Sequence, residues 1–307
     1  MKAVIHIGMP KSGTSTIQAF LDMNRDALSQ RGVLYDRFDP RFGSQFELAI
    51  IGLSAVGRQI PPQFERKLLN LHTIDDVHNY TERYAAHLSK QLSAQNGHHC
   101  FAGSSEHLYA WLNSVEQIEA LDKFLSQRFS QVQYILYLRA QEELVLSSYS
   151  EAIRRVHSHS LAQHLAASGR INHYIPVERW VGAVGRERLV LRVLSPDILK
   201  DGDLLTDFCH HTGIGASDLL RPGRVNTAMS VEEVQIRRVL NRVLPRQGGD
   251  GDMHPLYRVA LKALLATRRN RTPLALTKEQ RAEIRQMNSP QNEALRQRFL
   301  PHLQTLF

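Results

Sequence analysis

The feature that constrains the fold most is a glycine-containing loop between an apolar segment and a helix. Residues 8–16 read GMPKSGTST and follow the mostly apolar residues 3–7. Apolar residues at helical spacing begin at Ile17. A strand, a glycine loop and a helix in this order point backbone N–H groups and the positive end of the helix at a phosphate. The sequence therefore predicts a phosphate-binding loop at residues 8–16.

This loop differs from the usual NTPase loop in the position of its lysine. Gly8 and Gly13 keep the spacing of the pattern GxxxxGK[ST], but Thr14 stands where the lysine is expected. Lys11 lies inside the loop instead. The loop therefore lacks the usual ligand for a β/γ-phosphate pair, which counts against a kinase.

The remaining pattern alternates strands with helices, which favours an α/β fold with a parallel sheet covered on both faces. We expect a P-loop-like three-layer fold in one domain over residues 1–307. The predicted strands are 3–8, 33–35, 99–104, 132–138 and 188–194. The predicted helices of this part are 14–30, 75–95, 116–129, 141–156, 172–183 and 202–212.

Two segments extend this core. Residues 36–97 form a predicted helical insertion. We expect it on the side of the strand ends, where open α/β sheets bind ligands and where an acceptor molecule for a transferred group would lie. The same length of chain is also compatible with packing or with a dimer contact. Residues 227–307 read as wholly helical, with predicted helices at 230–243, 255–267, 278–288 and 291–304.

The composition is that of an ordinary globular protein, with 42% hydrophobic and 22% charged residues. No stretch approaches the roughly 18 apolar residues of a membrane span, and no signal-peptide pattern is visible. Cys100 and Cys209 are too few for a disulfide framework. These features favour a cytoplasmic protein.

The net charge of +8 predicts an anionic ligand. Nucleic acid is not expected, because the sequence has no zinc-finger spacing, RNP-like aromatic string or long basic tail. The fifteen histidines show no HxxxH or HExxH pattern, so no metal site is expected.

The loop resembles the 5′-phosphosulfate loop of the sulfotransferases, which reads P-K-[ST]-G-T-[ST]. Residues 10–15 read PKSGTS and match it. The resemblance implies sulfuryl transfer from 3′-phosphoadenosine 5′-phosphosulfate (PAPS) to an acceptor hydroxyl, with no metal. It also implies that Lys11 meets the bridging oxygen of the leaving phosphate. The residues expected to hold the 5′-phosphate are Lys11, Ser12, Gly13, Thr14, Ser15 and Thr16.

A second match concerns the 3′-phosphate. The family places an arginine at a strand end and a serine eight residues later, and Arg139 and Ser147 keep that interval. An arginine fork suits a phosphate, and a hydroxyl early in a helix adds a donor near the positive helix end. Ser148 is a neighbouring alternative.

A weaker resemblance to bacterial and carbohydrate sulfotransferases extends downstream to about residue 245. It rests on Trp180, Gly185, residues 188–191 and residues 203–208. About sixty residues at the carboxyl end are not covered by it.

The general base is expected after the strand at 99–104, where residues 104–107 read SSEH. Some members of the family have a histidine here, and several carbohydrate and bacterial members have a glutamate. We favour Glu106 over His107 and expect the base to be partly buried, because burial raises a carboxyl pKa. The alternative is that Glu106 only caps the next helix.

The chain departs from the cytosolic members in two places. Thr16 replaces an aromatic residue, and the Arg-Lys-Gly string that grips the 3′-phosphate is missing. Arg221 or Arg224, in the loop 221–226, is the candidate replacement for this grip. Both departures favour the carbohydrate-type branch, and hence a sugar or glycan acceptor. The alternative functions are a P-loop kinase or other NTP-dependent phosphotransferase, and a non-catalytic nucleotide-binding module.

Overall fold

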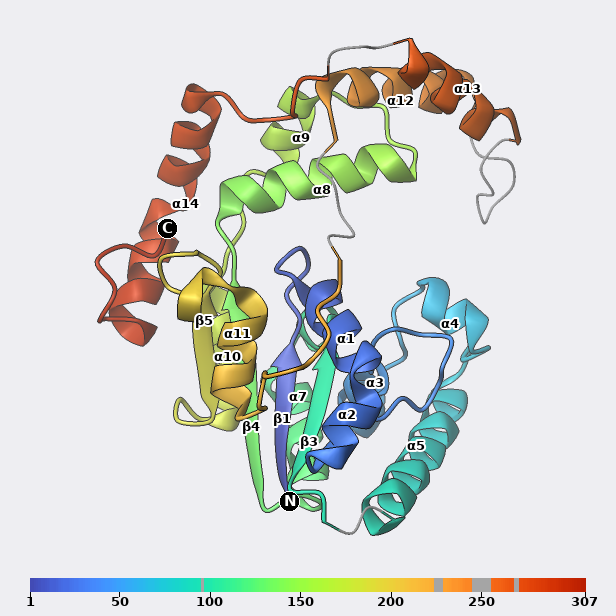
Figure 1. The fold of residues 1–307 in the computed structure, drawn as a ribbon, viewed down its shortest axis with the longest axis vertical. Coiled ribbons are helices and arrows are strands. Elements are labelled where there is room, and N and C mark those ends of the chain that lie inside the picture. Colours follow the sequence, from blue (N-terminus) through green and yellow to red (C-terminus); the bar gives the residue numbers. More distant parts are fainter. Residues whose placement is uncertain (95–96, 224–228, 245–254, 268–270) are drawn as a thin grey trace. The chain divides into compact units, whose positions relative to one another are not determined.

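A parallel five-stranded sheet forms the core of the fold. In this computed structural model its strands run in the order β2-β3-β1-β4-β5 (Figure 1). The structure describes residues 1–307 except 95–96, 224–228, 245–254 and 268–270. The strands are β1 (Lys2–Ile7), β2 (Val33–Leu34), β3 (Cys100–Ser105), β4 (Gln131–Leu138) and β5 (Leu189–Val193).

Helices make up most of the rest of the described chain. They are α1 (Thr14–Met23), α2 (Arg25–Gln30), α3 (Glu47–Ala55), α4 (Phe64–Leu68), α5 (Ile74–Ala94), α6 (His107–Trp111), α7 (Val115–Ser126), α8 (Gln141–Arg155), α9 (Leu161–Ser168), α10 (Tyr174–Val184), α11 (Leu204–Thr212), α12 (Val231–Val243), α13 (Pro255–Ala266) and α14 (Lys278–Phe299), with a 3-10 turn at Lys200–Gly202. Among the described residues, none of these helices has the length and apolar character needed to cross a membrane.

The chain is grouped into two compact units. The first comprises Met1–Arg139, His173–Gly223 and Ala294–Phe307, and the second comprises Ala140–Asn172 and Arg224–Glu293. The whole sheet belongs to the first unit. Our expectation of one domain over residues 1–307 stays a prediction.

The register of the sheet brings three strand ends to one edge. Ile7, the last residue of β1, lies opposite Ser105 of β3 on one side and Leu136 of β4 on the other. The segments that follow β1, β3 and β4 therefore leave the sheet at the same carboxyl edge, where open α/β sheets bind ligands.

Helices cover both faces of this sheet, so the expected α/β three-layer fold is confirmed. On one face α1, α2 and α11 bury Phe20, Leu28 and Phe208 against strand residues that include Val4 and Tyr137. On the other face α7 packs against β4 and against α10. The strands are rich in apolar residues with little alternation because both faces are covered.

The predicted helix 14–30 is wrong in one respect, because it breaks at Asn24 into α1 and α2. The Asn24 amide donates to the carbonyls of Phe20 and Leu220, at 2.7 and 2.8 Å. Its Oδ1 accepts from the Leu220 N–H at 2.8 Å. A partner 196 residues away fixes this break, which local periodicity does not reveal.

Helix α3 is a second difference, because the sequence pattern gave no helix at 47–55. Every residue from Glu47 to Leu53 is buried. A helix that is buried on all sides has no apolar stripe with a period of 3.6 residues, so its pattern is not that of an amphipathic helix. The insertion 36–97 is helical as expected, through α3, α4 and α5.

At the carboxyl end, two predicted helices are one continuous helix. α14 runs from Lys278 to Phe299 with Pro290 inside it. The prediction was two separate helices, at 278–288 and 291–304. The predicted helices 230–243 and 255–267 correspond to α12 and α13, whereas the helix predicted to reach residue 304 ends at Phe299.

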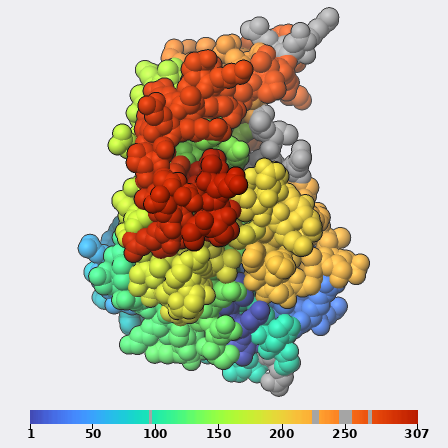
Figure 2. All heavy atoms as spheres, turned by 90° about the vertical axis from the view of Figure 1, so that its left-hand side faces the viewer, coloured from blue at the N-terminus to red at the C-terminus, as the bar shows by residue number. Residues whose placement is uncertain are grey.

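The last turn of α14 and the chain end pack beside α10 within the first unit (Figure 2). The ring of Phe299 lies 5.9 Å from that of Tyr174, and the ring of Phe307 lies 5.7 Å from that of His173. The carboxyl-terminal residues therefore complete the helix layer over the β5 side of the sheet.

The second unit has its own small core. Tyr149 and Ile153 of α8 pack against Met229 and Val234. The buried amide of Asn241 in α12 donates to the carbonyls of Ile153 and His157, and accepts a hydrogen bond of 2.7 Å from the Tyr257 hydroxyl of α13. This side chain therefore joins three helices of the unit.

Candidate functional site

The loop 8–13 makes a tight turn between β1 and α1. Gly13 is the N-cap residue of α1 and is left-handed, with a φ of 85°. Lys11 is also left-handed, with a φ of 65°. Among the described residues, no side chain caps the start of α1. The Thr16 N–H donates to the Gly13 carbonyl at 2.9 Å, so the N–H groups of Thr14 and Ser15 are those that an anion at this helix end would contact.

The carbonyl of Met9 holds the loop together. It accepts hydrogen bonds from the Ser12 hydroxyl at 2.6 Å, the Thr14 hydroxyl at 3.1 Å and the Ser12 N–H at 3.2 Å. Ser12 and Thr14 are buried, whereas Ser15 and Thr16 are exposed in the first turn of α1. The hydroxyls of Ser12 and Thr14 therefore shape the loop, and those of Ser15 and Thr16 face solvent.

Gly8 is needed because the loop passes close to the end of β3. A Cβ atom at Gly8 would lie 2.5 Å from Cγ2 of Thr14 and 3.0 Å from Cα of Glu106. The Gly8 N–H also donates to the Ser105 carbonyl at 3.0 Å. The backbone of Glu106 is thereby placed directly beside the loop.

Gly13 packs against the start of α11. A Cβ atom at Gly13 would lie 2.3 Å from Cδ2 of Leu204, the first residue of that helix. Glycine is required here twice, for its left-handed backbone and for this close approach. The position of α11 therefore helps to define the loop.

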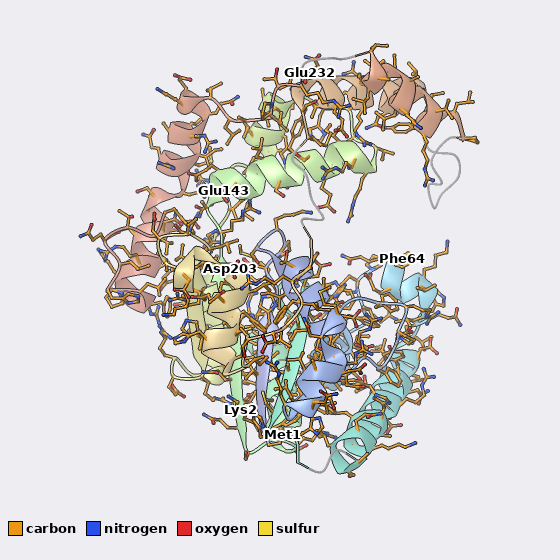
Figure 3. The ribbon with its side chains drawn as sticks, viewed as in Figure 1. Met1, Lys2, Phe64, Glu143, Asp203 and Glu232 are labelled. Atoms are coloured by element: carbon orange, nitrogen blue, oxygen red, sulfur yellow. The ribbon has the colours of Figure 1, made fainter. Side chains whose placement is uncertain are left out.

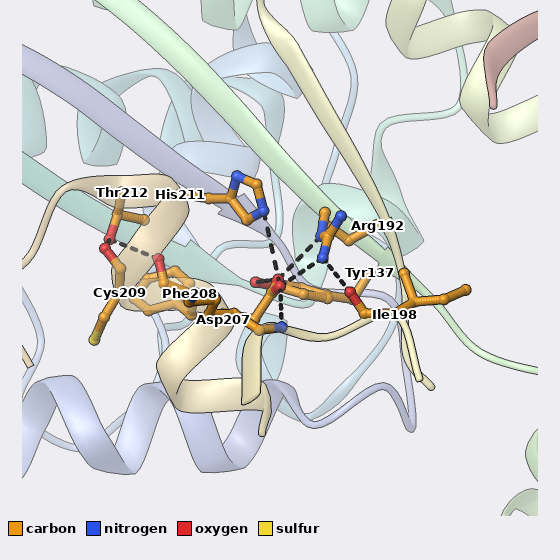
Figure 4. Close-up of polar contacts among 9 residues, drawn as sticks. Tyr137, Arg192, Ile198, Asp207, Phe208, Cys209, His211 and Thr212 are labelled. Atoms are coloured by element: carbon orange, nitrogen blue, oxygen red, sulfur yellow. Dashed lines mark hydrogen bonds and ion pairs between the residues drawn. The ribbon is translucent and has the colours of Figure 1, made fainter. Parts of the chain in front are cut away.

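A buried ion pair fixes α11 to the sheet (Figure 4). Asp207 accepts hydrogen bonds from Arg192 Nη2 at 2.6 Å, the Lys200 N–H at 2.8 Å and the Tyr137 hydroxyl at 2.9 Å. Burial by itself would raise the pKa of Asp207, but the hydrogen bonds from Arg192, Lys200 and Tyr137 outweigh it and lower the pKa. A paired carboxylate thus joins α11 to β4 and β5.

Arg139 follows β4 and reaches the loop. Its guanidinium donates to the Lys11 carbonyl, and His173 Nε2 lies 2.9 Å from the Arg139 carbonyl. Burial lowers the pKa of His173 to about 4, so the ring is neutral at pH 7 and donates its Nε2 proton. Arg139 is held at both its side chain and its backbone.

Glu106 begins the short helix α6 at the same edge of the sheet. It occupies the N-cap position, but its side chain makes no capping hydrogen bond within the described chain. The residue is exposed. We expected a partly buried base, and the structure differs on this point because β3 ends at Ser105 and Glu106 turns outward before α6.

His107 is buried under the insertion instead. Its Nε2 lies 3.2 Å from Glu65 Oε1, and its Nδ1 lies 3.4 Å from the Ser105 hydroxyl. Its ring centroid is 4.3 Å from that of Trp111. Adjacent residues at a strand end point in different directions, so Glu106 and His107 do not share one environment.

Gln45 fixes the end of β3 from the insertion. Its Oε1 accepts from the Ser104 N–H at 2.6 Å, and its own N–H donates to the Ser104 carbonyl at 3.1 Å. The Ser104 hydroxyl lies 2.9 Å from Nδ1 of His6, which is fully buried in β1. Sequence reasoning missed Gln45, His6 and Leu204, since each acts through a partner distant in the chain.

Other predicted site residues lie in the second unit or outside the described residues. Ser147 is half-buried in α8 of the second unit, so its part in a 3′-phosphate site stays a prediction. Ser148 donates to the Val145 carbonyl and lies 2.8 Å from His164 Nε2. Arg224 lies outside the described residues.

Arg221, the other candidate for the 3′-phosphate grip, is paired near the start of α11. It donates to Oδ1 of Asp203 at 2.8 Å and to the Thr206 hydroxyl at 2.9 Å. Asp203, labelled in Figure 3, is the N-cap residue of α11. It accepts a hydrogen bond from the Thr206 N–H at 2.8 Å. In this structure Arg221 supports the helix that packs against Gly13.

Two cationic residues, Lys11 and Arg139, meet at the loop through the Lys11 carbonyl. Within the described ranges no three His, Cys, Asp or Glu side chains are arranged to hold a metal ion. The loop, Lys11 and Arg139 form a donor set that suits the phosphates of a nucleotide.

Comparison with known proteins gives limited information. No protein-family model matches the chain, and no curated protein matches its sequence. One similar solved structure is a sulfotransferase from Alicyclobacillus acidocaldarius, with 15% sequence identity and a TM-score of 0.43. The similarity covers 86% of this chain and 91% of that chain. A likeness at this level carries no argument about activity, which has to come from the residues of the site.

Proposed function

We propose that this protein transfers a sulfuryl group from PAPS to an acceptor hydroxyl. The observation that carries the proposal is the loop PKSGTS, placed after β1 at the carboxyl edge of the sheet, with Arg139 contacting Lys11. Sulfuryl transfer requires positioned donors and cations rather than a protein nucleophile, as in phosphoryl transfer.

The residues of the loop fit such a cosubstrate. The N–H groups at the start of α1 and the exposed hydroxyls of Ser15 and Thr16 hold the 5′-phosphate. The Lys11 ammonium stabilises charge on the bridging oxygen as the bond between sulfur and that oxygen breaks. Arg139 and Ser147 hold the 3′-phosphate, which separates PAPS from nucleotides without this group.

Glu106 takes the proton from the acceptor hydroxyl. The acceptor oxygen then bonds to sulfur, and the products are a sulfate ester and 3′-phosphoadenosine 5′-phosphate (PAP). Glu106 is preferred over His107 because its Cα lies next to Gly8 and its side chain is exposed. Within the described chain this side chain makes no capping hydrogen bond to α6. His107 is buried, and both of its ring nitrogens face hydrogen-bonding groups.

For the acceptor we propose a sugar or glycan hydroxyl. This class rests on the two departures from the cytosolic members, Thr16 after the loop and the missing Arg-Lys-Gly string. The insertion that carries Phe64 and α4 stands on the proposed acceptor side (Figure 3).

The first test is nucleotide binding, measured as the melting temperature with PAP, ADP or ATP–Mg²⁺. A ligand that binds the folded state raises the melting temperature by mass action. We expect a larger shift with PAP than with ADP, and a reduced PAP shift in Arg139→Ala and Arg139→Lys. Arg83→Ala, on the exposed side of α5, is the matched control and should keep the wild-type shift.

Two outcomes would contradict the proposal. Equal shifts with PAP and ADP would show that no 3′-phosphate is recognised. A shift with ATP–Mg²⁺ and none with PAP would instead support a phosphotransferase.

The base is tested separately by transfer from PAPS. Glu106→Gln should lower kcat by about 10²- to 10⁴-fold, the usual contribution of a general base, with an unchanged PAP shift. If Glu106→Gln transferred at the wild-type rate and His107→Asn did not, the roles of the two residues would be reversed.

A further inference from the structure

Helices α12 and α13 form a pair within the second unit. Ile236 and Leu240 of α12 pack against Tyr257 of α13, and Leu261 and Leu265 pack against this cluster. The face of α13 that carries these residues is therefore covered by α12.

The side of α13 that α12 does not cover carries an apolar stripe and a basic stripe. At 100° per residue, Leu256, Val259 and Ala263 form one stripe along the helix, and Arg258 and Lys262 form a second stripe beside it. All five residues are exposed. The outer side of α13 is thus an apolar stripe next to a basic stripe.

The apolar side chains of this helix pair are strongly exposed. Leu256 is 60% and Val259 is 67% accessible, and on α12 Val239 and Val243 are 55% and 63% accessible. Isolated exposed apolar residues are normal on protein surfaces, but several on two helices that pack together point to an interaction surface.

The segment of sequence that contains α13 is basic, and the nearest acidic residues on either side of it are Asp252 and Glu279. Residues 253–278 contain six lysines and arginines and no aspartate or glutamate. The net charge of the whole chain is +8, so this segment concentrates charge far beyond its share of the length. Within this segment positive charge and apolar residues coincide.

A shallow pocket lies where the basic stripe meets the covered face. Its volume is about 440 Å³. Leu261, Leu265 and Ala266 supply apolar lining, and Arg258, Lys262 and Arg271 supply positive charge. This combination of apolar and cationic lining suits an amphiphile with an anionic head.

We propose that the outer side of α13 docks onto an anionic membrane surface. The apolar stripe enters the boundary between headgroups and acyl chains, and the arginine and lysine of the second stripe contact lipid phosphates. Long basic side chains can lie along an apolar surface while their charges remain in the headgroup layer. This inference does not depend on the proposed sulfuryl transfer.

Charge complementarity favours a lipid surface over the other possible occupants. A second copy of the chain would bring like charges together if it paired through the same acid-free stripe. Nucleic acid would match the charge, but it offers no partner for Leu256 and Val259. An anionic bilayer matches both stripes.

The test is co-sedimentation of the full-length protein with vesicles of phosphatidylcholine alone or with phosphatidylglycerol added. We expect binding to the anionic vesicles and little to the neutral ones, weakened by salt. Arg258→Gln/Lys262→Gln should weaken binding by about 30-fold, at roughly fivefold per charge. Leu256→Gln/Val259→Gln should weaken it by about tenfold or more.

Matched controls come from exposed residues of the first unit. Lys90→Gln/Lys123→Gln removes the same charge from α5 and α7, and Ile74→Gln removes one exposed apolar residue. Both controls should bind like wild type, and the melting temperature shows whether each variant is folded.

The proposal is overturned by any of four results. The first is no binding to anionic vesicles, and the second is equal weakening of that binding by the control variants. The third is a dimer, seen without vesicles by analytical ultracentrifugation, that Leu256→Gln/Val259→Gln dissociates. The fourth is RNA binding that the two α13 double variants abolish while vesicle binding remains.

Discussion

The guanidinium of Arg139, at the end of β4, donates a hydrogen bond to the backbone carbonyl of Lys11, in the loop after β1. The two residues are 128 positions apart in the sequence and meet because β1 and β4 are adjacent parallel strands. Lys11 itself has a left-handed backbone. The arginine thus contacts the loop at the residue whose side chain we propose to act in transfer.

Lys11→Gly separates the role of this side chain from that of its backbone. Glycine adopts a φ of 65° readily, so the variant should be as stable as wild type or up to about 1 kcal/mol more stable. Transfer from PAPS should fall by about 10²- to 10³-fold, because a charge-stabilising group is lost. Asp218→Gly, with a φ of 62°, is the control for the backbone effect and should keep full activity. If Lys11→Gly turned over at the wild-type rate, the Lys11 side chain would not have the proposed role in transfer.

Gly13→Ala should destabilise the protein by about 2–4 kcal/mol, measured by denaturant unfolding. The left-handed backbone disfavours alanine, and the new Cβ would lie 2.3 Å from Leu204 Cδ2. Gly57 has a φ of 65°, and a Cβ atom there would meet nothing within 4 Å, so Gly57→Ala should cost only about 1 kcal/mol. Adding Leu204→Ala to Gly13→Ala should remove the part of this destabilisation that comes from the steric clash. Equal losses in Gly13→Ala and Gly57→Ala would show that Leu204 does not constrain the loop.

Glu47→Gln should make the protein more stable in alkaline solution. Glu47 is buried in α3, and burial raises its pKa to about 8. Because the folded pKa lies above the unfolded value, stability is fully present below about pH 4 and decreases as pH rises to about 8. Glutamine does not ionise, so the free energy of unfolding of Glu47→Gln should rise relative to that of wild type by about 1 kcal/mol per pH unit across this range. Urea unfolding between pH 5 and 8 measures it, with the exposed Glu119→Gln as control. Parallel pH profiles for wild type and Glu47→Gln would contradict this account.

Asp207→Asn should destabilise the first unit by about 3–5 kcal/mol, because it leaves Arg192 without its charged partner. The folded pKa of Asp207 is lowered, so its ionic contribution is present above about pH 4 and is lost as pH falls further. The stability of Asp207→Asn should therefore fall less than that of wild type as the pH drops below about 4. Asp122→Asn disrupts the more exposed Asp122–Arg188 pair and should cost less. Thermal unfolding from pH 3 to 7 compares the two, and equal losses would show that burial does not distinguish the pairs.

Part of the site could be predicted because it is local in sequence. The loop 8–16 lies between a strand and a helix, and its glycines and lysine follow a recognisable spacing. Arg139 was expected at the end of its strand and is found there. Helix α3 was not predicted, since a fully buried helix has no amphipathic period.

The sequence by itself determined the alternation of strands and helices, the composition of the phosphate-binding loop and the positive charge, because each depends on neighbouring residues or on simple counts. Only the tertiary structure decided that Glu106 is exposed while His107 is buried against Trp111. It also decided that Leu204 contacts Gly13 and that Arg139 contacts Lys11. These contacts depend on the order of parallel strands and on the packing of distant helices, which local preferences do not specify.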